Sequence, residues 1–272
     1  MDRLWVDKYR PKSLETLDYH SDLSGRLQKL AKMQDFPHLL LYGPNGAGKK
    51  TRVMAFLNDV YGNGVNKMKS EQREFKASAS SSNTVECNII SSNFHLDITP
   101  SDADFHDKVI VQNLIKEVAS TSQLDSKVQK AFKVIIINEV DKLSKEAQAA
   151  LRRTMEKYIS KCRLILICEN LGRVIPPIRS RCLMIRVAAP SEIEVQGVLE
   201  KISKKENMFN QEGLCAKIAK ECERNLRRSV IQLQTCKMQK NLTVDQKLHI
   251  PEWKLAIKTI ADDVRQEQTP KK

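Results

Sequence analysis

The glycine-rich segment Gly43-Pro44-Asn45-Gly46-Ala47-Gly48-Lys49 contains the residues whose types and spacing most clearly point to chemistry. It follows the apolar run Leu39–Tyr42 and precedes a stretch of helical periodicity, so the predicted order is strand, glycine loop, helix. Glycines allow backbone N–H groups and a helix N-terminus to face phosphate oxygens, which a lysine side chain also reaches. The segment therefore predicts a phosphate-binding loop.

The position after Lys49 departs from this pattern. A hydroxyl residue is expected there as a Mg²⁺ ligand, but the sequence has Lys50, and Thr51 comes one residue late. One residue turns a helical side chain by roughly 100°, so Thr51 is expected to point away from the metal. Lys50 also places a cation where a cation ligand is needed. We therefore expect Mg²⁺ binding to be weak or absent.

A second group of polar residues, Asn138-Glu139-Val140-Asp141, directly follows an apolar run. ATPases of this type usually end such a strand with Asp-Glu. Asn138 keeps an oxygen acceptor but lacks the charge that holds Mg²⁺, whereas Glu139 remains able to polarise water. By itself the group is also consistent with an ordinary polar strand end. Beside the phosphate-binding loop, we interpret it as a degraded metal site.

The elements that must position these residues alternate between short β-rich runs and longer segments of helical period. Such alternation is typical of a parallel sheet covered by helices, and we assign this α/β unit to residues 1–190. The expected strands are Leu39–Tyr42, Phe94–Ile98, Lys133–Ile137, Arg163–Cys168 and Leu183–Val187. The expected helices are Lys49–Val60, Lys108–Ser120, Lys145–Tyr158 and Arg173–Arg179. Lys76–Asn83 and Thr121–Val128 are predicted surface loops.

From residue 191 onward the strand signals cease, and apolar residues recur at helical spacing. The recurrence runs through Ile193–Ile202, Leu214–Ile218 and Leu226–Leu233. This pattern predicts a small helical domain over residues 191–265. The remaining residues, 266–272, are polar and charged and are expected to form a frayed tail.

Composition limits the kind of protein and its partners. The 41% hydrophobic and 29% charged residues describe a globular protein, and no apolar run approaches the roughly 20 residues of a membrane span. The N-terminus lacks a secretory or transit signal, so we expect an intracellular protein. Seven cysteines without zinc-site spacing are expected to be reduced and mostly buried, with no metal site. The net charge of +13 favours a polyanionic partner, although scattered surface lysines also account for it.

Three further segments carry a family resemblance that covers essentially the whole chain. They are Trp5-Val6-Asp7-Lys8-Tyr9-Arg10-Pro11, Ala147–Glu156 and Ser180-Arg181-Cys182. Together with the phosphate-binding loop they resemble the small subunits of replication factor C, the clamp-loader branch of the AAA+ ATPases. The combination of Gly48-Lys49-Lys50-Thr51 with Ile175-Pro176-Pro177-Ile178-Arg179 resembles the subunit-three branch of that family in particular.

The resemblance implies an AAA+ P-loop core followed by a small α-helical lid domain that together bind ATP or ADP. The implied nucleotide-binding residues are Val6, Tyr9, Arg10, Pro11, Gly43, Pro44, Asn45, Gly46, Ala47, Gly48, Lys49, Lys50, Thr51, Asn138 and Arg227. Arg181 matches the arginine finger that completes the site of an adjacent subunit, and Arg227 matches a lid arginine that senses nucleotide. Without the resemblance, both arginines would be interpreted as solvated surface charges.

The implied partners are the other replication factor C subunits in a heteropentamer, the sliding clamp known as proliferating cell nuclear antigen, and primer–template DNA. The implied DNA contacts are Lys108, Lys145, Arg152 and Arg153, for which a solvated helix face is the alternative. Arg152 is also suited to bracing the packing between helices. We expect a nuclear protein without membrane partners, and we expect the family's C-terminal collar to be missing from this chain.

Another departure concerns the end of the fourth strand, where the family usually carries an asparagine sensor. Glu169 occupies that position, and Asn170 comes one residue late. A carboxylate there repels a phosphate, so Lys50, Asn138 and Glu169 together predict a subunit that binds nucleotide but hydrolyses it poorly. An autonomous DNA-stimulated ATPase would need Ser or Thr at position 50 and Asp at position 138. A GTPase would need an Asn-Lys-x-Asp motif. A scaffold with an empty pocket is the third alternative, which the intact glycines and Lys49 oppose.

Overall fold

A computed structural model describes residues 3–33, 35–76, 84–120, 132–159, 161–208, 213–239, 248 and 250–266. Its centre is a seven-stranded sheet in the order β2-β3-β4-β5-β6-β1-β7. Five strands pair in parallel: β1 (Leu39–Tyr42), β4 (His95–Ile98), β5 (Lys133–Ile137), β6 (Cys162–Cys168) and β7 (Leu183–Arg186). All five were predicted, and no boundary differs by more than one residue. Because the strands are parallel, β1, β5 and β6 end at the same edge and bring their following loops together.

One edge of the sheet is an antiparallel pair that the sequence did not reveal. Strand β2 (Lys69–Lys76) pairs with β3 (Thr84–Ser91), which pairs antiparallel with β4. β2 is largely polar, as is usual for an edge strand, so it lacks the apolar run by which the other strands were recognised. Lys76, expected in a loop, is the last residue of β2. The rest of that predicted loop and the predicted loop at 121–128 lie outside the described residues.

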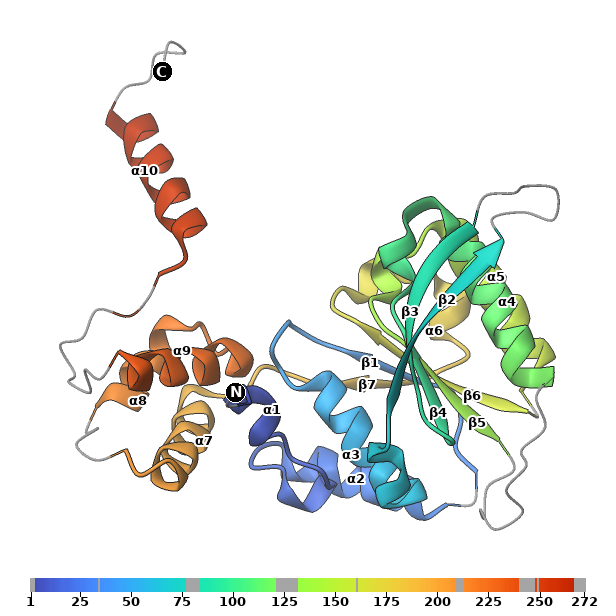
Figure 1. Cartoon of the computed structure of the whole chain (residues 1–272), viewed down its shortest axis with the longest axis horizontal. Helices are drawn as coiled ribbons and strands as arrows, with labels where there is room; N and C mark the ends of the chain where they lie inside the picture. The colour runs from blue at the N-terminus through green and yellow to red at the C-terminus, as the bar shows by residue number, and fades with distance from the viewer. Residues whose placement is uncertain are drawn as a thin grey trace.

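Helices cover both faces of the sheet (Figure 1). Helices α2 (Ser21–Lys32) and α3 (Lys49–Tyr61) share one apolar cluster with the sheet, and α4 (Asp107–Ser120) and α5 (Lys145–Lys157) share another. The predicted single helix Arg173–Arg179 is wrong, since a 3₁₀ turn ends at Arg173 and α6 spans only Pro176–Arg179. Pro176 and Pro177 have no N–H to donate, so a helix cannot continue through them.

Beyond the sheet, α7 (Glu192–Lys205), α8 (Leu214–Glu221) and α9 (Leu226–Met238) form a separate helical unit. Its apolar cluster includes Trp5 from α1 (Trp5–Lys8), whose backbone N–H donates to Gln234 Oε1 at 3.0 Å. The first residues of the chain therefore pack against the helical unit (Figure 1). The contact therefore joins α1, which precedes the sheet in the chain, to the helical unit, which follows it.

The final described element, α10 (Glu252–Gln266), stands apart from the other helices (Figure 1). Its apolar side chains are exposed: Trp253, Leu255, Ile257, Ile260 and Val264. Among the described residues, no helix is both long enough and apolar enough to span a membrane.

Candidate phosphate-binding site

The glycine loop approaches two other segments so closely that side chains would not fit. Gly43 has φ 153°, and a Cβ there would lie 1.9 Å from the backbone oxygen of Val187. Gly46 has φ 74°, and a Cβ there would lie 1.9 Å from Oδ1 of Asn225, the residue that caps α9. The glycine spacing read from the sequence thus allows the loop to lie against the end of β7 and against the helical unit.

Lys49 is almost completely buried, and its ammonium group lies over the loop. Its Nζ donates to the carbonyl oxygens of Gly43 at 2.6 Å and Pro44 at 2.9 Å. Burial lowers the pKa of Lys49; the nearby Glu169 carboxylate raises it, and Arg227 lowers it. The oxygens of a phosphate carry more charge than carbonyl oxygens, so a bound phosphate would draw this ammonium group away from the two carbonyls. A lysine placed in this way over a glycine loop is suited to binding an anion.

A cavity of about 900 Å³ opens beside the loop, between the sheet and the helical unit. Its size suits a mononucleotide. It is lined by most of the nucleotide-site residues predicted from the sequence: Val6, Tyr9, Arg10, Pro11, Asn45, Gly46, Gly48, Lys49, Lys50, Thr51, Asn138 and Arg227. Gly43, Pro44 and Ala47 do not line it. Thr51, expected to turn away from the metal position, still borders the cavity.

Several lining residues were missed by the sequence analysis because they belong to distant segments. The helical unit adds Val198, Lys201, Ile202, Lys205, Leu226 and Val230, and the segment after β4 adds Thr99. The helix periodicity marked some of these as apolar, but it could not show that one face of the helical unit closes over the loop. Glu169 also lines the cavity, as its position after β6 predicted.

Lys50 on α3 and Asn138 after β5 both bond to Asp97 on β4 in a way that does not suit Mg²⁺. Lys50 Nζ lies 2.7 Å from Asp97 Oδ2, and Asn138 Nδ2 donates to Asp97 Oδ1 at 2.6 Å. An ammonium and an amide NH₂ therefore surround the buried carboxylate, whereas Mg²⁺ requires oxygen ligands. In the part of the chain that the structure describes, no cluster of three His, Cys, Asp or Glu side chains could hold a metal ion.

Glu139, which the sequence left able to polarise water, is held by its neighbours. It adopts a left-handed conformation with φ 53°. Its Oε2 accepts a hydrogen bond from Ser101 Oγ at 3.2 Å and pairs with Lys142 Nζ at 2.9 Å. These contacts draw carboxylate charge away from any water in the cavity.

The cysteines agree with the expectation from composition. All seven are free, and six of them are buried. Burial raises the pKa of the Cys168 and Cys182 thiols to about 12. Neither thiol is therefore a thiolate nucleophile near neutral pH.

A polar cluster fastens the N-terminal segment to the helical unit beside the cavity. Glu206 Oε1 accepts hydrogen bonds from Lys8 Nζ and Tyr9 Oη, and its Oε2 pairs with Lys237 Nζ at 2.7 Å. These partners, led by Lys237, lower the pKa of Glu206 from 4.5 to about 2. The cluster fixes Tyr9, one of the residues that line the cavity.

The depressed pKa of Glu206 predicts a pH-dependent contribution to stability. The contribution is fully present above pH 4.5, the ordinary pKa, and is lost as pH falls toward the folded-state pKa of about 2. At pH 7 we expect wild type to melt about 2–4 °C above Glu206→Gln, the shift that roughly 1 kcal/mol gives in a domain of this size. Thermal unfolding followed by circular dichroism at stepped pH checks this. A difference that stays constant down to the folded-state pKa would contradict it.

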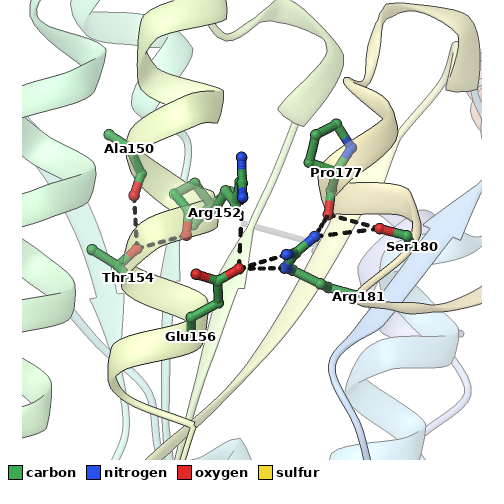
Figure 2. Close-up of polar contacts among 8 residues, drawn as sticks. Ala150, Arg152, Thr154, Glu156, Pro177, Ser180 and Arg181 are labelled. Atoms are coloured by element: carbon green, nitrogen blue, oxygen red, sulfur yellow. Dashed lines mark hydrogen bonds and ion pairs between the residues drawn. The ribbon is translucent and has the colours of Figure 1, made fainter.

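Arg181 lies outside the cavity and is held in place by residues around it (Figure 2). Its Nε and Nη2 contact Glu156 Oε1 at 2.7 and 2.6 Å, and its Nη1 donates to Pro177 O at 2.9 Å. Arg152 approaches the same carboxylate at 3.7 Å. Glu156 is the last residue of the segment Ala147–Glu156, and the sequence predicted no function for it. The Arg181 side chain is one-third exposed, so part of it faces solvent.

The four predicted DNA-contact residues lie on α4 and α5, which run side by side (Figure 1). Asp107 joins the starts of these helices by accepting hydrogen bonds from Ser144 N at 2.7 Å and Ser144 Oγ at 3.0 Å. Lys108 and Lys145 therefore extend from adjacent helix ends, and all four basic residues are exposed. Lys108 also forms a loose pair with Glu146 at 3.5 Å. The pairing of Arg152 with Glu156 lies within α5 and connects no second helix, so the bracing role considered for Arg152 stays a prediction.

Comparisons with known proteins match both parts of the chain. A family described as DNA polymerase III, delta subunit, matches residues 19–191, and one described as RCF1/5-like, AAA+ ATPase lid domain, matches residues 197–238. The chain is 48% identical to replication factor C subunit 3 of Arabidopsis thaliana over 99% of this chain and 77% of that protein. It is 49% identical to replication factor C subunit 5 of Neurospora crassa over 98% of this chain and 76% of that protein.

Among solved structures, the Thermotoga maritima RuvB Holliday junction branch migration motor superposes with a TM-score of 0.60. The sequence identity is 16%, and the match covers 87% of this chain and 70% of that one. At this identity the likeness concerns the fold alone. It confirms the predicted core of parallel strands and flanking helices with a helical lid.

Proposed function

Because the chain belongs to the replication factor C subunit 3/5 family, we propose that it is a nucleotide-binding, hydrolysis-deficient subunit of a clamp loader. In that role it helps to place a sliding clamp on primer–template DNA. The proposal rests chiefly on one observation. A complete phosphate-binding loop and its buried Lys49 face a cavity whose metal subsite is filled by Lys50 and Asn138 around Asp97.

Nucleotide binding is supported by how the cavity is enclosed. The loop supplies backbone N–H groups and Lys49 for the phosphates, the helical unit supplies Arg227, and the N-terminal segment supplies Tyr9 and Pro11 for the base. When bound, ATP or ADP would join three segments that are distant in sequence. Burial removes the Lys49 ammonium group from water, which costs folding free energy. A subunit that served only as a scaffold would have no use for such a buried charge.

Weak hydrolysis is supported by three features of the same cavity. Lys50 and Asn138 supply no charged oxygen to a metal ion, Glu139 is engaged by Ser101 and Lys142, and the Glu169 carboxylate borders the cavity. Phosphoryl transfer depends on a bound metal ion, a positioned water and stabilised negative charge on the phosphoryl group. The first feature removes metal ligands, the second weakens the activation of water, and the third opposes the charge on the phosphates.

Turnover by the purified chain tests this proposal. We expect ATP and ADP to bind in equilibrium titrations, and we expect phosphate release no faster than that of the Lys49→Ala variant. The double variant Lys50→Thr/Asn138→Asp restores oxygen ligands and should gain Mg²⁺ affinity. Robust Mg²⁺-dependent hydrolysis by the wild-type chain would contradict the hydrolysis-deficient assignment.

The remaining parts of the proposal concern location and assembly. The relatives are named as subunits of replication factor C, so we assign this chain to a heteropentamer of such subunits that acts in the nucleus with proliferating cell nuclear antigen. In that ring Arg181 serves the ATP site of an adjacent subunit. Its position outside the chain's own cavity supports action in trans.

DNA binding by this chain is expected to be weak, indifferent to sequence and strongly dependent on salt. Lys108, Lys145, Arg152 and Arg153 would neutralise phosphates, so log K should fall with log salt by about 0.9 per contact, or roughly 3–4 for four contacts. Fluorescence anisotropy with primer–template DNA at several salt concentrations measures this slope. Replacing Lys145 with Ala should lower the slope by about 1. Binding that followed base sequence, or ignored ionic strength, would oppose phosphate readout.

A further inference from the structure

Lys50 occupies the position where phosphate-binding loops ordinarily present a metal-ligating hydroxyl, and its partner is unusual. The partner, Asp97, lies on β4, and its side chain is only 3% exposed. Lys50 Nζ lies 2.7 Å from Asp97 Oδ2. The Lys50 side chain remains 37% exposed and lines the cavity. Asp97 thus holds the Lys50 ammonium group from the buried side, while part of the Lys50 side chain faces the cavity.

The second oxygen of Asp97 is also occupied. Asn138 Nδ2 donates to Asp97 Oδ1 at 2.6 Å and to the Ile98 carbonyl at 3.0 Å. The amide therefore turns its NH₂ group toward the carboxylate. A metal ion entering this space would meet an ammonium and two N–H donors, and it would have to displace a buried ion pair to reach any carboxylate oxygen. Breaking such a pair leaves an uncompensated buried charge.

We propose that Lys50 is a built-in cation that replaces Mg²⁺, so that this site binds a nucleoside diphosphate or triphosphate without a divalent metal. The inference deepens the proposed nucleotide-binding function and depends on it. Asp97 anchors the ammonium, as a ligand would anchor a metal, and Asn138 fills the remaining oxygen of Asp97. Lys49 and Lys50 then provide two positive charges for the phosphates, and Asp97 lowers the repulsion between them.

An ammonium also differs from Mg²⁺ in ways that fit this subunit. It donates hydrogen bonds to phosphate oxygens but carries one charge instead of two, so it supports binding better than phosphoryl transfer. Because it is covalently attached, its occupancy does not vary with the free metal concentration. The nucleotide in this site would then act as a permanent structural element.

Titration calorimetry with ADP tests the proposal in two buffers, one with excess EDTA and one with excess Mg²⁺. For the wild-type chain we expect that excess Mg²⁺ does not tighten the Kd, and that it weakens the apparent Kd only as far as Mg²⁺ sequesters free ADP in solution. Removing both charges with Lys50→Thr/Asp97→Asn should weaken binding in EDTA by at least about tenfold, the loss expected for one charge-assisted hydrogen bond. This pairing of substitutions avoids leaving Asp97 buried without its cation. The matched control is Lys116→Thr, which removes an exposed lysine outside the cavity.

The possible outcomes distinguish the built-in cation from the proposed nucleotide-binding function on which it depends. A wild-type Kd that tightens by about tenfold or more on adding Mg²⁺ would overturn the built-in cation but leave the nucleotide site standing. Equal affinities of wild type and the double variant in EDTA, with both folded by circular dichroism, would also overturn it. If the double variant does not fold, the comparison of the wild-type Kd in EDTA with that in Mg²⁺ still tests the proposal. Failure of ADP and ATP to bind in either buffer would instead refute the proposed nucleotide-binding function.

Discussion

Arg181→Ala is expected to lower ATP hydrolysis at the adjacent subunit's site by about 10³–10⁵-fold, the range associated with loss of an arginine finger. In the proposed role the guanidinium would stabilise charge that develops on a phosphoryl group bound to the adjacent subunit, so we expect the effect there. Glu156 and the Pro177 carbonyl already hold Arg181 in one orientation, so little entropy is lost when it engages a neighbour. Nucleotide binding by this chain should be unchanged.

The measurement uses a reconstituted complex in which only that adjacent site can hydrolyse ATP. Arg181→Lys should resemble Arg181→Ala more than wild type, because an ammonium lacks the planar fork that donates two hydrogen bonds. Arg173→Ala removes another exposed arginine and serves as the control. Arg152 remains close to Glu156 in the Arg181→Ala variant, so we expect the fold to be retained. Full activity of that variant would reduce Arg181 to a surface charge.

Lys49→Ala is expected to weaken ATP and ADP binding to this chain by about 10–100-fold, the loss for one or two charge-assisted hydrogen bonds. Lys49 is the buried cation of the loop, and its ammonium is already directed toward the carbonyls of Gly43 and Pro44. The Lys49 side chain itself lines the cavity, so water can take its place beside the Gly43 and Pro44 carbonyls, and the fold should survive.

Equilibrium titration with either nucleotide measures the change, and thermal unfolding checks the fold. Lys29→Ala removes an exposed lysine of α2 that does not line the cavity, and it should bind nucleotide like wild type. Unaltered affinity of Lys49→Ala would mean that the loop does not hold the phosphates. Only a wild-type chain that bound neither ATP nor ADP would favour the scaffold with an empty pocket.

Much of the sheet could be predicted because four of its five parallel strands, β1, β4, β5 and β6, are largely buried. Residues 134–137 form an apolar run bounded by Lys133 and Asn138, and such runs indicate burial directly. The edge strand β2 escaped because an edge exposes much of its surface to water, which removes the apolar signal. The helix expected at 173–179 failed for a different reason. Periodicity reported a buried face there, but the two prolines set the backbone.

The sequence alone predicted the phosphate-binding loop, the five parallel strands in their order along the chain, and the positions where ligands for a metal are missing. These features depend on glycine spacing, residue type and short-range periodicity. Tertiary structure decided what the changed residues contact. Lys50 meets Asp97, Arg181 meets Glu156, and Trp5 enters the core of the helical unit. Those contacts follow from strand order and from helix packing between distant segments, which no local pattern encodes, and charge pairs depend on distance in space.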